Sequence, residues 1–133
     1  TAVQHNRIRL LSDGSPQRDF IHSLDICRAV KILLEAEDED FQENTFHIAS
    51  GNTLTILELA HIVKKVYKER YHSEIQIYLP DNSISNELGN FKKKERYSFS
   101  TTRMKKLHFY TQTNLDTGIN KLFDYLEKHY ENK

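Results

Sequence analysis

Several residue types are scarce in this chain of 133 residues. Its one cysteine, Cys27, excludes an internal disulfide, and tryptophan is absent. Four glycines and two prolines are too few for a collagen-like chain or a Pro/Gly-rich disordered chain. No apolar run is long enough to span a bilayer, and no stretch has the pattern of a signal peptide. We therefore expect a cytoplasmic protein without a membrane partner.

Net charge is also missing, because 19 Lys and Arg residues balance 19 Asp and Glu residues. Such a chain has no global field to attract nucleic acid, so no nucleic-acid partner is expected. Any anion site must be a local cluster of basic side chains. The seven histidines show no metal-finger spacing, and we expect no metal site. The 38% content of hydrophobic residues suits one globular domain over residues 1–133.

Residues 13–29 predict a turn, a short strand and the start of a helix. Gly14 permits a positive φ and Pro16 fixes φ, so both favour the turn. Phe20 favours a strand over residues 19–22. Ser23 is the expected cap of a helix over residues 23–36.

The spacing of apolar residues predicts the remaining elements. One face of the helix over residues 23–36 is expected to be buried, and it carries Leu24, Cys27, Val30 and Leu34. Thr55 and Glu58 form a capping box that begins a second long helix. Further strands are expected at residues 8–11, 44–50 and 75–79, and further helices at residues 101–107 and 115–130.

Arg18 lies at the junction between the turn and the strand. Its planar, permanently charged guanidinium suits a phosphate or a carboxylate. The alternative is that Arg18 pairs with Asp19 or Asp25, or is only solvated. Arg96 ends the one dense basic cluster, residues 92–96, which is either an anion contact or a solvated basic loop.

Two neighbours of Arg18 are further candidates. Phe20 follows Arg18 by two residues, so strand alternation would put both side chains on one face. The alternative for Phe20 is an ordinary core residue. Gln17 is either a polar contact to a ligand or a stabiliser of the loop.

The motif Gly-x-x-x-Arg-Asp-Phe-Ile-His-x-x-Asp-Ile of residues 14–26 resembles the extended short-chain dehydrogenase/reductases. These are the NAD(P)-dependent sugar-nucleotide epimerases, dehydratases and reductases. Residues 46–51 and the Thr-x-x-Glu-Leu-Ala pattern of residues 55–60 are similar to later family segments, and the resemblance covers nearly the whole chain. His47 and Ala49 replace the usual asparagine and glycine, and the family's Arg-x-Gly-Asp segment is not matched.

The resemblance implies a small mixed α/β substrate-binding portion, with about four helices and four to five short strands. The chain has neither the Gly-x-x-Gly-x-x-Gly fingerprint nor the Tyr-x-x-x-Lys pair of the family. It therefore resembles a C-terminal substrate-binding domain that lacks the N-terminal Rossmann half. The catalytic residues and the site for NAD or NADP are expected in that half, so this chain alone should be inactive as an oxidoreductase.

By the same resemblance, Arg18 contacts the diphosphate of a nucleotide sugar and Arg96 is a second anion contact. Gln17 and Phe20 complete the expected substrate-binding set, with the loop of residues 80–90 as a lid. The expected partners are the nucleotide sugar and the chain's own Rossmann half. A homodimer of the full-length protein is one further option.

Two other functions stay open. One is a reductase or dehydrogenase of the same superfamily that acts on a non-nucleotide substrate, which the missing Arg-x-Gly-Asp segment favours. The other is a non-enzymatic ligand-binding or interaction module. The motif is common to epimerases, dehydratases and reductases, so it does not select a sugar, a base or a reaction among them.

Overall fold

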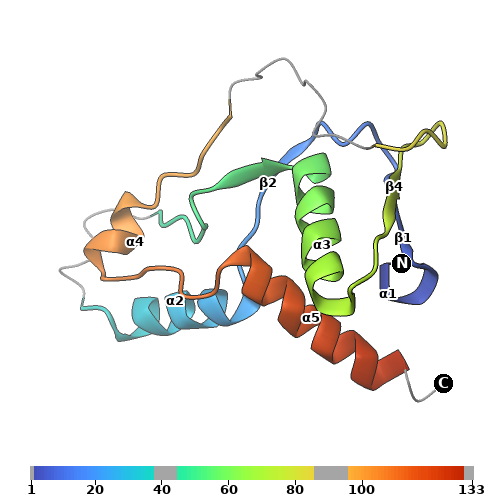
Figure 1. The fold of residues 1–133 in the computed structure, drawn as a ribbon. Helices are drawn as coiled ribbons and strands as arrows, with labels where there is room; N and C mark the ends of the chain where they lie inside the picture. Colours follow the sequence, from blue (N-terminus) through green and yellow to red (C-terminus); the bar gives the residue numbers. More distant parts are fainter. Residues whose placement is uncertain (1, 38–44, 86–95, 131–133) are drawn as a thin grey trace. The chain divides into compact units, whose positions relative to one another are not determined.

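A computed structural model describes residues 2–37, 45–85 and 96–130. These residues form a mixed α/β fold of five helices and four short strands (Figure 1). In chain order, the elements are α1 (Ala2–His5), β1 (Arg7–Arg9), β2 (Gln17–Asp19), α2 (Ser23–Glu35), β3 (Thr53–Thr55), α3 (Ile56–Tyr71), β4 (Gln76–Tyr78), α4 (Thr102–Lys106) and α5 (Leu115–Tyr130). The predicted fold class is confirmed.

The chain divides into two compact units, each with its own hydrophobic core. The first unit comprises Thr1–Arg18, Leu54–Arg96 and Asp116–Lys133, and the second comprises Asp19–Thr53 and Tyr97–Leu115. The chain passes between the units four times: within β2, within β3, after Arg96, and after Leu115 at the start of α5. A boundary inside the predicted motif is a feature that the sequence pattern did not indicate.

A parallel strand pair forms the centre of the first unit. β1 pairs with β4, and Ile8 lies opposite Ile77. Ile77 is fully buried and packs with Leu10 and Leu57. β2 pairs with β3 in a separate sheet, so β1 and β2 do not form a hairpin. The predicted alternation of residues 75–79 is confirmed, because the apolar positions point into this core.

The capping box at the start of α3 is confirmed. The Thr55 hydroxyl accepts a hydrogen bond from the Glu58 N–H at 3.1 Å, and the Glu58 carboxylate accepts one from the Thr55 N–H at 2.8 Å. At the other end, His72 has a φ of 51°, and its N–H donates to the Lys68 carbonyl at 3.0 Å. Side chain and backbone therefore fix both ends of this helix.

A network of charged and aromatic side chains fastens α5 to the C-terminal end of α3. Figure 1 shows the ribbon of α5 passing this end of α3. The Arg70 guanidinium donates to Asp124 at 2.6 Å and to Glu127 at 2.7 Å. The Tyr71 hydroxyl donates to Glu127 as well. Burial raises the pKa of Tyr71 to about 12, and the hydrogen bond to Glu127 acts in the same direction. Tyr71 is therefore a neutral donor at physiological pH.

Gly14 is required where the turn meets α3. Its φ is 79°, and a Cβ added to it would lie 2.7 Å from the Cβ of Leu57. The carbonyls of Gly14 and Pro16 accept hydrogen bonds from the N–H groups of Leu57 and Ile56 at 3.0 and 2.9 Å. The predicted turn therefore packs directly on the first turn of the helix.

The second unit is organised around a buried carboxylate on α2. Asp25 is fully buried and pairs with Arg28. Its two oxygens also accept the N–H groups of Gln112 and Thr113, each at 3.1 Å. Arg28 in turn donates to the Tyr110 carbonyl at 2.7 Å. These bonds join α2 to the segment that follows α4, over a core of Ala29, Met104 and Phe109.

The bounds of α2 are close to those predicted, but its predicted buried face is wrong. Leu24, Val30 and Leu34 are 55%, 44% and 81% exposed, and Cys27 is also exposed. The opposite face is buried, because the Asp25 carboxylate finds its hydrogen-bond donors only inside the unit. The cap also differs from the prediction, since the His22 ring rather than Ser23 accepts the Leu24 N–H, at 3.2 Å.

The predicted strand over residues 44–50 is not formed by the described residues 45–50. Phe46 and Ile48 still pack on the core of the second unit, as the alternation predicts. The part of the chain that the structure describes offers no backbone neighbour to this segment, and a strand requires one. The strand in this region is instead β3, three residues after Ser50.

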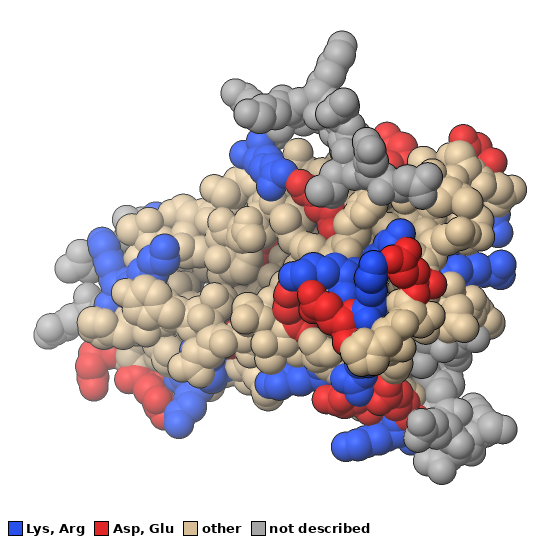
Figure 2. All heavy atoms as spheres, viewed as in Figure 1, with Lys and Arg blue, Asp and Glu red and all other residues tan. Residues whose placement is uncertain are grey.

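No helix in residues 2–37, 45–85 and 96–130 is long and apolar enough to cross a membrane. On the face drawn in Figure 2, basic and acidic side chains lie interspersed, as expected for a chain of zero net charge.

Candidate functional site

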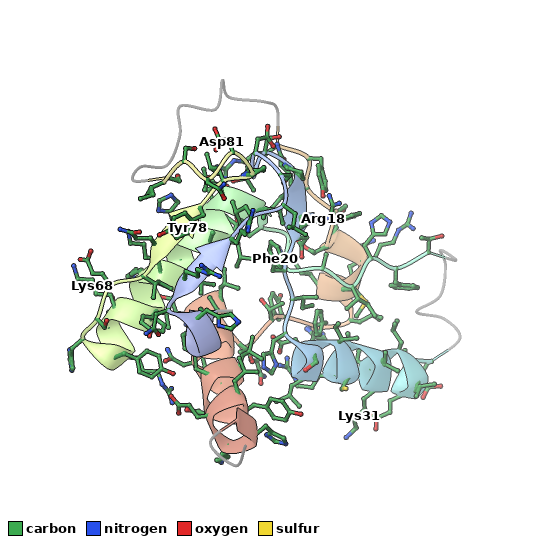
Figure 3. The ribbon with its side chains drawn as sticks, turned by 90° about the vertical axis from the view of Figure 1, so that its right-hand side faces the viewer. Arg18, Phe20, Lys31, Lys68, Tyr78 and Asp81 are labelled. Atoms are coloured by element: carbon green, nitrogen blue, oxygen red, sulfur yellow. The ribbon has the colours of Figure 1, made fainter. Side chains whose placement is uncertain are left out.

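Arg18 occupies the middle of β2 and is exposed (Figure 3). One of its Nη atoms donates to the carbonyl of the preceding Gln17 at 2.6 Å. The ion pairs formed among the described residues do not include Arg18. Over the ranges that the structure describes, the charge of the guanidinium is therefore not compensated by a carboxylate.

The two carboxylates considered as alternative partners are bound elsewhere. Asp19 accepts the Ser50 and Gly51 N–H groups at 2.7 and 2.9 Å, and so holds the Ser50–Gly51 turn of the second unit. Asp25 is committed to Arg28 and to two backbone N–H groups. The proposed pairing of Arg18 with either aspartate is not what the described contacts show.

Arg96 is in the opposite situation, since its guanidinium pairs with the Glu58 carboxylate. Burial raises the pKa of Glu58, but hydrogen bonds from Thr55 and Arg96 outweigh it, so the pKa lies below its ordinary value. Glu58 is therefore ionised at neutral pH and carries the negative charge that Arg96 faces. The predicted second anion contact already has an anion, supplied by α3.

Both arginines belong to the first unit, and each is linked to the first turn of α3, Arg96 by an ion pair and Arg18 through the chain that precedes it. Arg18 follows Pro16 by two residues, and the Pro16 carbonyl binds the Ile56 N–H. Arg96 binds Glu58, two residues further along α3. The N–H groups of this turn are bound by the chain itself, so the helix end is not an anion site.

The other predicted residues have less distinct environments. Gln17 is half-buried and belongs to the first unit, whereas Phe20 is half-buried and belongs to the second. In the predicted lid, residues 80–85 are described, and Asp81 closes a tight turn by accepting the Ser83 N–H at 2.9 Å. Residues 86–90 and 92–94 lie outside the described part of the chain.

The second unit contains an open pocket of about 260 Å³ that the sequence did not indicate. Its lining consists of Asp19, Ile21, Phe46, His47, Ile48, Ala49 and Phe99. The His47 and Phe99 rings meet edge to face, with centroids 5.6 Å apart. The departures from the family pattern at His47 and Ala49 were the only signal in the sequence, and both residues line this pocket.

The chemistry that Arg18 offers is binding of an anion. Within the described ranges, no group of three or more His, Cys, Asp or Glu side chains could hold a metal ion. A guanidinium has five donors and does not titrate near neutral pH, so it can orient a phosphate but cannot transfer a proton.

Comparisons with known proteins find a family model and a curated protein of similar sequence. Residues 1–49 match the family model described as the NAD dependent epimerase/dehydratase family. The GDP-L-fucose synthase of Sinorhizobium fredii (strain NBRC 101917 / NGR234) is 27% identical over 117 residues, which are 88% of this chain and 33% of that protein.

Solved structures of similar fold were also found. The UDP-glucuronic acid 4-epimerase from Bacillus cereus, in complex with UDP-glucuronic acid and NAD, matches 93% of this chain and 36% of its own length, with a TM-score of 0.67 and 17% identity. RMD from Pseudomonas aeruginosa, complexed with NADPH, matches 96% of this chain and 37% of its own length, with a TM-score of 0.68 and 18% identity. The chain spans about a third of the length of the relatives it matches.

Proposed function

We propose that this chain, whose resemblance to the NAD-dependent epimerase/dehydratase family is confirmed by those matches, is the nucleotide-sugar-binding part of a longer enzyme. In this proposal Arg18 binds the diphosphate of the substrate. The observation that carries it is the Arg18 guanidinium, which occupies the arginine position of the family motif and is exposed without a carboxylate partner among the described residues.

The remaining parts of the reaction are assigned to the rest of the longer protein. A catalytic tyrosine and lysine and a site for NAD or NADP would lie there, and this chain alone would be inactive. The similar structures that contain NAD or NADPH support the use of a nicotinamide cofactor by the whole protein.

The exposed apolar face of α2 supports the existence of a covering partner. Ile26, Cys27, Val30 and Leu34 are all exposed on this helix. With Leu24 included, five apolar side chains are exposed here. A stable interface takes about 20–30 residues a side, so any partner must also cover neighbouring surface. We propose that the Rossmann half covers this face together with neighbouring surface.

The test is binding of UDP-, GDP-, CDP- and dTDP-sugars by calorimetry to the chain and to the full-length protein. Arg18→Ala should abolish binding, because it removes the bidentate donor to the diphosphate. Arg9→Ala is the matched control, since it removes an equally exposed arginine of the same unit outside the motif. Equal losses in both variants would contradict a specific role for Arg18.

A second candidate function is favoured by the Glu58–Arg96 ion pair. With Arg96 neutralised, Arg18 is the single uncompensated arginine of the predicted pair, which suits a substrate with one anionic group. A reductase or dehydrogenase of the same superfamily that acts on a non-nucleotide substrate would fit. If the full-length protein binds none of the four nucleotide classes, that result would favour a non-nucleotide substrate.

A further inference from the structure

We infer that Glu58 is a specificity-determining residue of the proposed anion site. Its carboxylate pairs with the Arg96 guanidinium, and this ion pair must break before Arg96 can bind a phosphate. The inference rests on the proposed function, since it concerns the second phosphate contact of the same site. It assigns to a capping residue a part in selecting between a ligand with one anionic group and a diphosphate.

The Glu58 carboxylate binds both Thr55 and Arg96. One carboxylate oxygen accepts the Thr55 N–H at 2.8 Å and the Thr55 hydroxyl at 3.1 Å, while the other oxygen contacts Arg96. The two tasks of the side chain therefore fall on different oxygens. Arg96 can leave without loss of the helix cap.

The Glu58–Arg96 ion pair is accessible to solvent, so another anion can replace Glu58. The Arg96 side chain is 54% exposed and that of Glu58 is 22% exposed, so water and a dissolved anion can reach the pair. A surface ion pair is screened and weak, which allows a diphosphate bound through both arginines to replace the carboxylate. Each phosphate of a nucleotide sugar carries one negative charge, as Glu58 does, so the diphosphate competes through its two linked charges.

Glu58 lies in the first turn of α3. Glu58 lies one residue from Leu57, whose N–H binds the Gly14 carbonyl, and Arg18 follows that glycine by four residues. Arg18 also lies on β2, which pairs with β3, and β3 ends at Thr55, three residues before Glu58. Repulsion from Glu58 adds to the competition for Arg96.

The test is Glu58→Gln in the full-length protein and in this chain. Glutamine at this position preserves the capping box and removes the charge. We expect UDP, GDP, CDP or dTDP to bind roughly two- to fivefold more tightly to the variant, the range that a weak exposed ion pair contributes to an equilibrium constant. Inorganic phosphate should gain less than the nucleotide that binds best, because it does not reach both arginines.

Two controls separate this effect from general electrostatics. Glu69→Gln removes one charge from the same helix, where Glu69 pairs with Lys65 at 3.8 Å, and should leave affinity unchanged. In an Arg96→Ala background, Glu58→Gln should no longer increase affinity. Circular dichroism should show that α3 is retained.

The outcomes distinguish the two proposals. Binding that Arg18→Ala abolishes but that Glu58→Gln leaves unchanged or weaker overturns this inference and leaves the diphosphate site standing. Equal gains in Glu58→Gln and Glu69→Gln also overturn it. Absence of nucleotide binding in every variant overturns both proposals.

Discussion

The two long helices α3 and α2 differ in how their surfaces are used. α3 of the first unit buries Leu57 and Ala60 against Ile77 of β4 and is fastened to α5 by Arg70. α2 of the second unit buries Asp25 and Ala29, while apolar side chains of its outer face are exposed. A single core covers one face of a helix, so the second apolar face of α2 stays exposed.

The comparison shows that polar groups, not apolar ones, decided the orientation of α2. The apolar residues would allow either face to be buried. Asp25 can be buried only where the Arg28 guanidinium and two backbone N–H groups reach it. The buried residues of α3 are Leu57, Ala60, Val66 and Tyr67, so an apolar and aromatic stripe sets its orientation.

The largest effect that would break this comparison is expected for Asp25→Ala. The substitution leaves the Gln112 and Thr113 N–H groups and part of the Arg28 charge without partners inside the second unit. Breaking a buried ion pair costs about 3–5 kcal/mol, so the free energy of unfolding should fall by that amount. Urea titration measures it, and hydrogen exchange should show α2 opening before α3.

Glu35→Ala provides the matched control for Asp25→Ala, because Glu35 is an exposed carboxylate on the same helix that pairs with Lys31 at 3.7 Å. Its effect should be less than about 0.5 kcal/mol. Lys31 projects from the ribbon of α2 into solvent, which fits a weak surface pair (Figure 3). A loss below about 1 kcal/mol for Asp25→Ala would mean that the buried carboxylate does not organise the second unit.

An intermediate effect is expected in the first unit at high pH. The Tyr71 pKa is raised from 10.0 to about 12 in the folded chain, so the folded state holds this proton more tightly than the unfolded state. The corresponding stability is complete below pH 10 and is lost as the pH rises through 12. Deprotonated Tyr71 would also face the Glu127 carboxylate.

The measurement for Tyr71 is the urea midpoint between pH 9 and 12, compared with Tyr71→Phe. The wild-type midpoint should fall more steeply with pH than that of the variant, which has no proton to lose at this position. Tyr125→Phe is the control, because Tyr125 is 56% exposed and stacks on His129 of the same helix. Identical slopes for wild type and Tyr71→Phe would contradict the assigned role.

Local patterns predicted most of the helices and the strands β1 and β4, whereas β2 lies at Gln17–Asp19 rather than at the predicted residues 19–22. Thr55 and Glu58 identify the start of α3 because the capping box needs only residues within one turn. Gly14 could be assigned a positive φ because proline and aspartate beside it form a turn. Such features depend on neighbours in sequence, which the sequence lists directly.

Features that depend on distant neighbours could not be predicted in this way. The strand expected over residues 44–50 has alternating apolar residues, but pairing depends on a second segment. Glu58 lies 38 residues from Arg96 in the sequence. Nothing in the sequence therefore indicated their ion pair, and Arg96 was predicted to be an anion contact. Arg18 was identified by its motif, while the pocket beside Asp19 required the folded second unit.

The smallest effect is expected for Leu34→Lys on the outer face of α2. Leu34 is 81% exposed, so a charged side chain there should change the stability of the chain by less than about 0.5 kcal/mol. Its neighbour Leu33 packs on the core of the second unit, and Leu33→Lys should lower stability by several times more. Thermal or urea unfolding of the two variants side by side measures the difference between the two faces.

In the full-length protein the loss of stability caused by Leu34→Lys should grow, because the proposed Rossmann half would cover this face. Equal losses for Leu33→Lys and Leu34→Lys in the chain alone would show that the outer face is already buried, and a small loss in the full-length protein would show that nothing covers it there.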